Sequence, residues 1–249
     1  MADFVDFATQ FADLAPARPI EHLGDTDLTF GGRIDSPLKI HEDGGEHGCG
    51  GKIWAAGELL CEHLIDNSDF TGFLSLCSEK LKTDGSCTNI LELGSGTGLV
   101  GICAGLLARS NGIEAKIYTT DIEMLIELMN SNIKLNGLEN MVFPEILMWG
   151  EQLDEKFKTD TSNRIDLVLA ADCVYLEDAF PLLEKTLLDL TEGDNPPTVL
   201  MSYTKRRKAN KVFFRRIRKH FRVVTITDFE RYEHYSRKRT YLFQLIRFQ

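Results

Sequence analysis

Short apolar runs and longer amphipathic stretches follow one another in a regular order through the middle of this 249-residue chain. The short runs are rich in β-branched and aromatic residues, which is typical of strands, and most stretches between them have the apolar spacing of helices. Five such strands are predicted, at residues 90–93, 116–120, 142–147, 165–170 and 198–203. Because strands that alternate with helices form mainly parallel sheets with helices on both faces, we predict a doubly wound α/β fold.

The N-terminal part has a different pattern. Residues 1–24 contain Pro16 and Pro19, and we expect a loosely ordered lead-in. Residues 28–40 alternate around Gly31 and Gly32, which predicts a hairpin. Residues 53–65 then have the spacing of a helix with one apolar face.

The C-terminal part ends in two apolar runs, residues 223–227 and 240–248, which are joined by a charged segment without an evident crossover helix. Two such strands suit a terminal antiparallel pair, which brings the predicted sheet to seven strands. No internal repeat or strong linker interrupts the chain. We therefore predict a single domain over residues 1–249, with an N-terminal extension and hairpin in 1–50 and the core in 51–249.

Composition agrees with one enzyme-sized domain, because 43% hydrophobic residues are enough to bury a full core. Acidic residues follow Met1 where a secretory signal would carry basic ones, so no signal peptide is expected. The most apolar window, residues 99–108, is too short to cross a bilayer. The six cysteines form no C-x-x-C pair, and we expect reduced thiols in a cytoplasmic monomer with no membrane partner.

His41, His47 and Cys49 lie close together in and beside a glycine-rich segment, residues 44–51. A metal site would need a fourth ligand at a usual spacing, and this segment offers none. We therefore predict no bound metal.

Charge is distributed unevenly, since ten Lys and Arg residues fall between positions 205 and 222 in a chain whose net charge is −10. Such a basic segment is compatible with nucleic-acid binding. The alternative is an amphipathic helix over residues 209–221 whose bases lie in water or contact an acidic protein. Its predicted sheet-facing residues are Val212, Phe213, Ile217 and Phe221. We favour the helix and do not expect nucleic acid as the partner.

The most informative segment is a glycine turn between a predicted strand and the next helix. Gly94, Gly96 and Gly98 occupy alternate positions, with Ser95 between the first two and Glu92 inside the preceding strand. Glycine permits a tight turn and the close approach of a ligand, and a helix N-terminus attracts anionic groups. The spacing differs from the dinucleotide pattern G-x-G-x-x-G, and no lysine follows it as in a P-loop. The form E-L-G-S-G-T-G resembles motif I of the seven-strand methyltransferases that use S-adenosylmethionine, and a tight turn without a ligand is the alternative.

A second acid is expected about 20 residues after the glycine turn, where it would hold a ribose. Asp121 closes the predicted strand 116–120, and its carboxylate can accept hydrogen bonds from both ribose hydroxyls. Asp121 can also serve as the N-cap of a helix predicted over residues 122–135. The two roles are compatible.

Five further residues lie at strand ends or loop edges. Trp54 opens the first predicted helix and Trp149 follows the third predicted strand. Large aromatic residues usually pack in the core, but these positions are equally compatible with a ligand pocket. The fourth predicted strand is followed by Ala171, Asp172 and Tyr175. Because ligands of open α/β sheets bind beyond the carboxyl ends of the strands, we expect these three residues to face the reaction site.

Six motifs appear in order: WAAGELL (54–60), ELGSGTGLVG (92–101), TD (120–121), NIKLN (132–136), WG (149–150) and ADCVY (171–175). This set resembles the family-16 protein-lysine methyltransferases, sometimes called the methyltransferase-like 21 group, and the likeness covers roughly residues 50–205. The resemblance implies a Rossmann-like class I methyltransferase with S-adenosylmethionine as cofactor and a protein substrate. Within the family, the chain looks most like the fungal branch that modifies translation elongation factor 1-alpha.

The resemblance also implies a role for each candidate residue. The family's methyl-donor contacts correspond to Trp54, Gly94, Ser95, Gly96, Asp121, Trp149 and Ala171, while Glu92 and Gly98 complete motif I. The family's D-x-x-Y/F element helps form the methyl-acceptor site, and it corresponds to Asp172 and Tyr175, which are the predicted catalytic residues. Met148 stands where the family often has an acid, so an adenine contact through that side chain is not expected.

The expected chemistry needs no metal, because methyl transfer from a sulfonium is an in-line displacement in which the protein mainly positions donor and acceptor. Asp172 can attract the incoming ammonium, and Tyr175 can wall the channel. Burial acts in the opposite direction by favouring the neutral amine. No general base is assigned.

Two other classes of protein are possible on the same fold. Nucleic-acid methyltransferases that act on the adenine N6 carry an N/D-P-P-Y/F element, where this chain has Cys173 and Val174 in place of the prolines. The sequence NPPT at 195–198 imitates that element but lacks the aromatic residue, and it is typical of a turn. A small-molecule methyltransferase is also compatible with the fold, whereas the intact glycines and Asp121 argue against a non-catalytic binding module.

Overall fold

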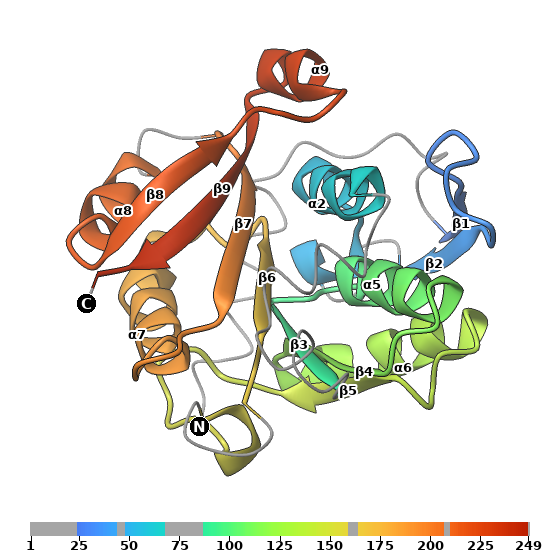
Figure 1. Cartoon of the computed structure of the whole chain (residues 1–249), viewed down its shortest axis with the longest axis horizontal. Coiled ribbons are helices and arrows are strands. Elements are labelled where there is room, and N and C mark those ends of the chain that lie inside the picture. The colour runs from blue at the N-terminus through green and yellow to red at the C-terminus, as the bar shows by residue number, and fades with distance from the viewer. Residues whose placement is uncertain (1–23, 44–47, 68–86, 159–163, 207–209, 249) are drawn as a thin grey trace.

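The computed structural model describes residues 24–43, 48–67, 87–158, 164–206 and 210–248. Its main element is a seven-stranded sheet with the strand order β5-β4-β3-β6-β7-β9-β8 (Figure 1). The strands are β3 (Thr88–Leu93), β4 (Ala115–Asp121), β5 (Val142–Ile146), β6 (Leu167–Ala171), β7 (Thr198–Thr204), β8 (Phe221–Ile226) and β9 (Thr240–Arg247). Strands β3 to β7 pair in parallel, whereas β9 runs antiparallel to both β7 and β8. The predicted α/β fold with a terminal antiparallel pair is confirmed.

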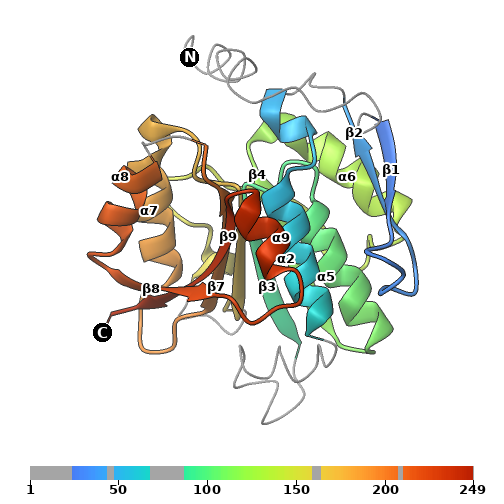
Figure 2. The ribbon, with the colours of Figure 1, turned by 90° about the horizontal axis from the view of Figure 1, so that it is seen from above.

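Helices cover both faces of the sheet (Figure 2). One layer contains α2 (Ala55–Asp66), α5 (Leu99–Ser110) and α6 (Ile126–Leu135), and the other contains α7 (Phe180–Leu190) and α8 (Asn210–Ile217). Every residue of β3 is buried because this central strand is covered from both sides. Two large hydrophobic clusters fill the two spaces between sheet and helices. The carboxyl ends of the parallel strands therefore meet at one edge of a rigid sheet.

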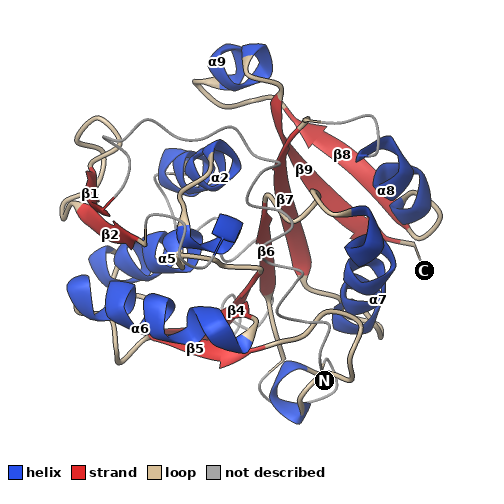
Figure 3. Ribbon diagram, turned by 180° about the vertical axis from the view of Figure 1, so that it is seen from behind, coloured by secondary structure: helices blue, strands red, loops and turns tan. Residues whose placement is uncertain are grey.

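The predicted N-terminal hairpin consists of two antiparallel strands, β1 (Gly24–Leu28) and β2 (Leu38–Glu42), and it lies beside α5 and α6 (Figure 3). Two amides of α6 bind the backbone of β2. Asn132 accepts from the His41 amide at 2.7 Å and donates to the His41 carbonyl at 3.2 Å. Asn136 makes the same pair of bonds with Lys39, at 3.0 and 2.7 Å. These side chains satisfy the open edge of β2 as a neighbouring strand would.

Short helices occupy several connections between the main elements. They are η3 (Gly48–Gly51), η4 (Glu123–Leu125), η5 (Glu155–Phe157), η6 (Glu177–Ala179) and α9 (Tyr232–Arg237). Helix α9 lies in the charged segment between β8 and β9, where no helix was evident from the sequence. It makes no crossover, since the two strands that it joins are antiparallel neighbours.

The predicted basic helix over residues 209–221 is shorter than expected. Phe221 is buried, but it begins β8 instead of ending the helix. Phe213 and Ile217 are buried as predicted, whereas Val212 is exposed and Phe214 is buried in its place. The reason is helical geometry, because positions 213, 214 and 217 share one face of the helix.

The predictions about membrane spans, cysteines and the N-terminal lead-in concern segments that the structure describes only in part. Among these residues, no helix is long and apolar enough to cross a membrane. The five cysteines that the structure describes are all free thiols. Cys77, His47 and the lead-in up to residue 23 lie outside the described residues.

Candidate functional site

The glycine turn connects β3 to α5 in a conformation that excludes side chains. Gly94, Gly96 and Gly98 have φ angles of 60°, 55° and 79°. A Cβ on Gly94 would lie 2.9 Å from the ring of Trp149, and one on Gly96 would lie 2.6 Å from the carbonyl oxygen of Gly50. Backbone conformation and close packing therefore both require glycine here.

Hydrogen bonds join the glycine turn to the end of β4. The Ser95 amide donates to the Thr120 carbonyl at 3.0 Å, and the Thr120 amide donates to the Ser95 hydroxyl at 2.9 Å. The Gly96 amide donates to one carboxylate oxygen of Asp121 at 2.8 Å. The turn and the second acidic residue are thus held together as one unit.

Asp121 also accepts a hydrogen bond from the Ile122 amide through its other oxygen, at 2.8 Å. Burial raises the pKa of this carboxyl to about 6, although both amide bonds favour the ionised form. The N-cap interpretation is wrong, because the N-cap of η4 is Ile122, whose own side chain makes no capping hydrogen bond, and Asp121 lies one residue earlier. The helix predicted over residues 122–135 begins as η4 and continues as α6.

Glu92 lies beneath the turn, with its side chain buried between β3 and α5. One carboxylate oxygen accepts from the Gly101 amide at 2.9 Å, which satisfies a free amide in the first turn of α5. Burial raises the pKa of Glu92 to about 8, and the Gly101 bond opposes this shift. Glu92 therefore supports the turn from below, and its backbone carbonyl also accepts from the Ser95 hydroxyl at 3.3 Å.

The two tryptophans have different neighbours. Trp149 is partly buried, lies over Gly94 and packs against the second hydrophobic cluster. One part of its ring therefore belongs to the core, and another part lies beside the glycine turn. Trp54 is the N-cap of α2, and its indole N–H donates to the Cys49 carbonyl at 2.8 Å. The guanidinium of Arg206 lies over the Trp54 ring, 4.8 Å from its centre.

Asp172 follows β6 with a φ of 58°, a left-handed conformation that aspartate tolerates better than most residues. Its amide donates to the Ser202 carbonyl at 2.8 Å, and one carboxylate oxygen accepts from the Thr204 amide at 3.2 Å. Arg206 donates to both carboxylate oxygens, at 2.9 and 2.5 Å. A guanidinium therefore compensates the buried charge of Asp172.

Neutral side chains surround this pair. Ala171 ends β6 and packs against the first hydrophobic cluster. Tyr175 is 41% exposed, and it is hydrogen-bonded to the Cys49 thiol. The Cys173 thiol lies 3.1 Å from the Leu93 carbonyl. Burial raises the pKa of both thiols, so they are uncharged at neutral pH.

The structure thus brings most predicted residues to the carboxyl edge of the sheet. Trp149 covers Gly94, Gly96 binds Asp121, and Trp54 is linked to Asp172 through Arg206. Arg206 was not among the predicted site residues, because it is one base among ten in a segment with no distinguishing spacing.

The rest of the basic segment has a mixed environment. Arg216 pairs with Glu184 of α7, with an Nε–Oε2 distance of 2.7 Å. Among the described residues of this segment, the exposed bases are Lys205, Lys211, Arg215, Arg218, Lys219 and Arg222. Separately, the described residues contain no group of three or more His, Cys, Asp or Glu side chains that could hold a metal ion.

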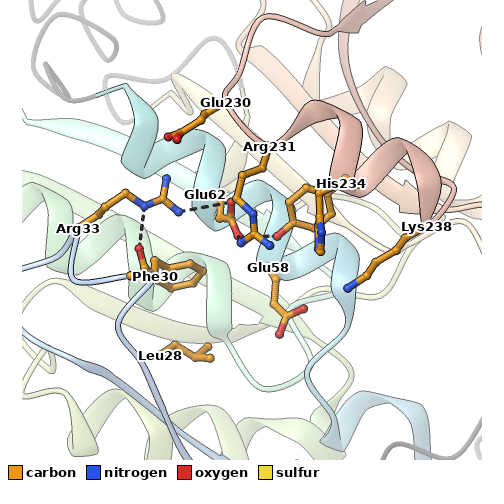
Figure 4. Close-up of a pocket in the computed structure, with 11 residues that line it drawn as sticks. Leu28, Phe30, Arg33, Glu58, Glu62, Glu230, Arg231, His234 and Lys238 are labelled. Carbon is orange, nitrogen blue, oxygen red and sulfur yellow. Dashed lines mark hydrogen bonds and ion pairs between the residues drawn. The ribbon is translucent and has the colours of Figure 1, made fainter.

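A cavity of about 520 Å³ lies away from the glycine turn, between the β1–β2 loop, α2 and α9 (Figure 4). The carboxylate of Glu62 accepts from Arg231 at 2.5 Å and from the Tyr235 hydroxyl at 2.7 Å. Arg33 approaches its other oxygen at 3.4 Å. Burial and the Glu62 bond raise the pKa of Tyr235, so its hydroxyl stays protonated.

Comparisons with known proteins agree with this arrangement. Residues 33–220 match the family Methyltransf_16, described as lysine methyltransferase. The chain is 54% identical to protein-lysine N-methyltransferase EFM6 of Saccharomyces cerevisiae, over 95% of this chain and 97% of the relative. It is 32% identical to protein N-lysine methyltransferase METTL21A of Danio rerio, over 85% of each chain. It is 29% identical to EEF1A lysine methyltransferase 3 of Mus musculus, over 70% of this chain and 64% of the relative.

The fold, the glycine turn and the two best-covered relatives all lead to one assignment. This chain belongs to the Methyltransf_16 family of lysine methyltransferases and is a protein-lysine N-methyltransferase.

Proposed function

We propose that this protein transfers a methyl group from S-adenosylmethionine to the side-chain amine of a lysine in translation elongation factor 1-alpha. The observation that carries the proposal is the 54% identity with EFM6 over nearly the whole chain. The mouse relative named EEF1A lysine methyltransferase 3 supports the elongation factor as target. The proposal places residues 1–249 in one catalytic domain that acts as a cytoplasmic monomer, and the free cysteines are compatible with that reducing compartment.

The chemistry of the donor-side residues fits S-adenosylmethionine, which when bound supplies a methyl group on a positively charged sulfur. Each oxygen of Asp121 has accepted one amide bond and retains a lone pair for a ribose hydroxyl. The partly buried Trp149 offers an aromatic surface beside Gly94. The positive end of the α5 helix dipole, at its N-cap Gly98, suits the carboxylate of the donor. Ala171, at the end of β6, completes the proposed donor side.

Asp172 and Tyr175 form the acceptor side of the proposal. The carboxylate of Asp172 orients the lysine amine, and Tyr175 forms one wall of the channel that the amine enters. The uncharged thiols of Cys49 and Cys173 lie nearby. Burial beside these uncharged groups favours the amine over the ammonium and opposes the effect of Asp172, so the proton leaves to water before transfer.

A nucleic-acid substrate is less well supported. Enzymes that act on a flipped base hold it with a proline-aromatic element after the fourth strand. Here Cys173 and Val174 occupy those positions, and both are buried in the core instead of forming a clamp. The segment 195–198 precedes and enters β7, at the opposite edge of the sheet from Asp172.

The test is incubation of the purified protein with labelled methyl donor and unmethylated recombinant elongation factor 1-alpha, in parallel with a cell lysate treated or untreated with ribonuclease. We expect label that survives ribonuclease and that mass spectrometry assigns to a lysine of the elongation factor. Label on RNA, or on histidine alone, would overturn the proposed chemistry. Label on a lysine of another protein would reject the target and keep the chemistry.

A further inference from the structure

The guanidinium of Arg206 connects the two sides of the proposed site. It follows β7, donates to both oxygens of Asp172, and stacks on the ring of Trp54. The side chain is 23% exposed, against 8% for Asp172. An arginine held by an ion pair and an aromatic ring has little conformational freedom, because its planar group is fixed on two sides.

This arrangement determines how Asp172 meets a substrate. An unpaired buried carboxylate is strongly unfavourable, and the ion pair with Arg206 offsets part of that penalty. The forked contact also fixes the plane of the carboxylate, and the Thr204 amide occupies one more lone pair. The remaining lone pairs therefore point in a defined direction, so Arg206 sets the geometry in which Asp172 can accept a hydrogen bond from an amine.

The same guanidinium places a fixed positive charge beside the incoming amine. Arginine stays protonated at every pH at which the enzyme works. A like charge a few ångströms away disfavours the ammonium form of a lysine, whereas Asp172 alone would favour it. The ion pair is close to neutral, so Asp172 can orient the amine without holding its proton.

We propose that Arg206 is a positioning residue for methyl transfer, which holds the Asp172 carboxylate toward the acceptor amine and keeps that amine in its neutral, nucleophilic form. The inference rests on the proposed function. It assigns to Arg206 an action through Asp172 and through charge, without contact between Arg206 and the methyl group.

Other groups near the acceptor side can titrate. They are Cys49 from η3, Glu92 from β3, Asp121 from β4, and Cys173 and Tyr175 from the segment after β6. All of them are present in each Arg206 variant. Removing the Arg206 charge acts on these groups as well as on the amine, so the charge-retaining variant Arg206→Lys is the reference for their contribution to the pH profile.

The test compares Arg206→Met and Arg206→Lys by the pH dependence of kcat on a lysine substrate. Arg206→Met removes both the charge and the fork, so kcat near neutral pH should fall about tenfold or more and the midpoint of the profile should move about one unit higher. Arg206→Lys keeps the charge but loses the fork. Its kcat should also fall, with a midpoint close to that of the parent.

Two controls separate this role from a general loss of structure. Arg216→Met breaks the comparable pair with Glu184 of α7 and should leave kcat and the midpoint unchanged. In a double-mutant cycle, adding Arg206→Met to Asp172→Asn should cause little further loss of kcat, because the two residues act as one unit.

A parent-like kcat and midpoint in Arg206→Met would overturn the inference, and so would full additivity with Asp172→Asn. If Arg206→Met does not fold, a parent-like kcat in Arg206→Lys overturns it instead. A parent-like rate in Asp172→Ala would contradict the proposed function itself. If kcat falls in Asp172→Ala but is parent-like in Arg206→Met, only the inference about Arg206 is contradicted.

Discussion

Asp172 and Glu62 are two buried carboxylates that arginine holds in different parts of the molecule. Glu62 lies in the middle of α2 and receives hydrogen bonds from Arg231 and Tyr235, while Arg33 approaches from the opposite side (Figure 4). Asp172 lies after β6 and has one arginine and one backbone amide as partners. By burial and ion pairing alone the two sites look alike.

Their backbones and neighbours differ. Glu62 occupies a regular helix, and its partners fix the β1–β2 loop and α9 onto α2. Asp172 has a left-handed backbone between the ends of two strands, and its arginine stacks on an aromatic ring. Conformations that cost energy persist where the surroundings enforce them, and such places are often functional. The comparison teaches that a buried ion pair points to catalysis only together with strain and position.

The largest expected effect is the loss of turnover in Asp172→Ala. The variant lacks the group that orients the amine, so kcat should fall about a hundredfold or more. Donor affinity, measured by calorimetry, should stay within about twofold of the parent, because Asp172 belongs to the acceptor side. Parent-like turnover in a folded Asp172→Ala variant would show that Asp172, like Glu62, is not needed for catalysis.

Glu62→Ala should have the opposite profile. Removing the carboxylate leaves the Arg231 guanidinium and the Tyr235 hydroxyl without their acceptor, so the free energy of unfolding should fall by about 3 kcal/mol. Turnover at a temperature where the variant is folded should stay within about twofold of the parent. Urea unfolding measures the first quantity. Intact stability with lost turnover would mean that the peripheral cluster belongs to the active site.

The sequence predicted the sheet and the glycine turn because both depend on local patterns. The central strands contain short apolar runs, and the alternate glycines mark a turn whose backbone is left-handed at all three positions. Asp121 was found by its distance from that turn. These signals lie within short segments and need no knowledge of distant contacts.

Contacts between residues far apart in the sequence could not be predicted from such local patterns. Asn132 and Asn136 belong to a recognised motif, but their bonds to β2 join residues more than ninety positions apart. Arg206 is hidden in a basic segment, since its role depends on Trp54 and Asp172, which come from two other elements. The early end of α8 could not be predicted either, because Phe221 is buried equally well in a strand.

Asp121 is a third carboxylate, and it differs from Asp172 and Glu62 in its proposed contact with the methyl donor. Asp121→Ala tests that contact. Loss of its charged acceptor should lower donor affinity about tenfold, or 1.4 kcal/mol, in calorimetry. A bulky residue at Gly96 should have a similar effect, because its Cβ would meet the Gly50 carbonyl. Unchanged affinity in a folded Asp121→Ala variant would contradict the donor-side assignment.

The pH dependence of donor binding should come from the same residue. The pKa of Asp121 is raised to about 6, so lowering the pH through 6 protonates the carboxylate and removes a ribose acceptor. At pH 5 about one tenth of the protein remains ionised at this residue, and donor affinity should be several-fold to about tenfold weaker than at pH 7. Asp121→Asn is the control and should lack this dependence. Because the pKa is raised, protonation favours the folded state, so weaker binding at pH 5 does not reflect unfolding through this group.

The smallest expected effect concerns the exposed bases Arg215 in α8 and Lys219 just after it, which have no carboxylate partner among the described residues comparable to that of Arg206. Replacing Arg215 and Lys219 by glutamine should raise the KM for the protein substrate about two- to threefold at low salt and leave kcat unchanged. The difference should disappear near 0.5 M salt, where the Debye length is about 4 Å, because contacts between exposed charges are screened while the buried Arg206–Asp172 pair is not. A fall in kcat would instead show that Arg215 and Lys219 act on the reacting groups. The exposed bases could then not be distinguished by function from the paired Arg206.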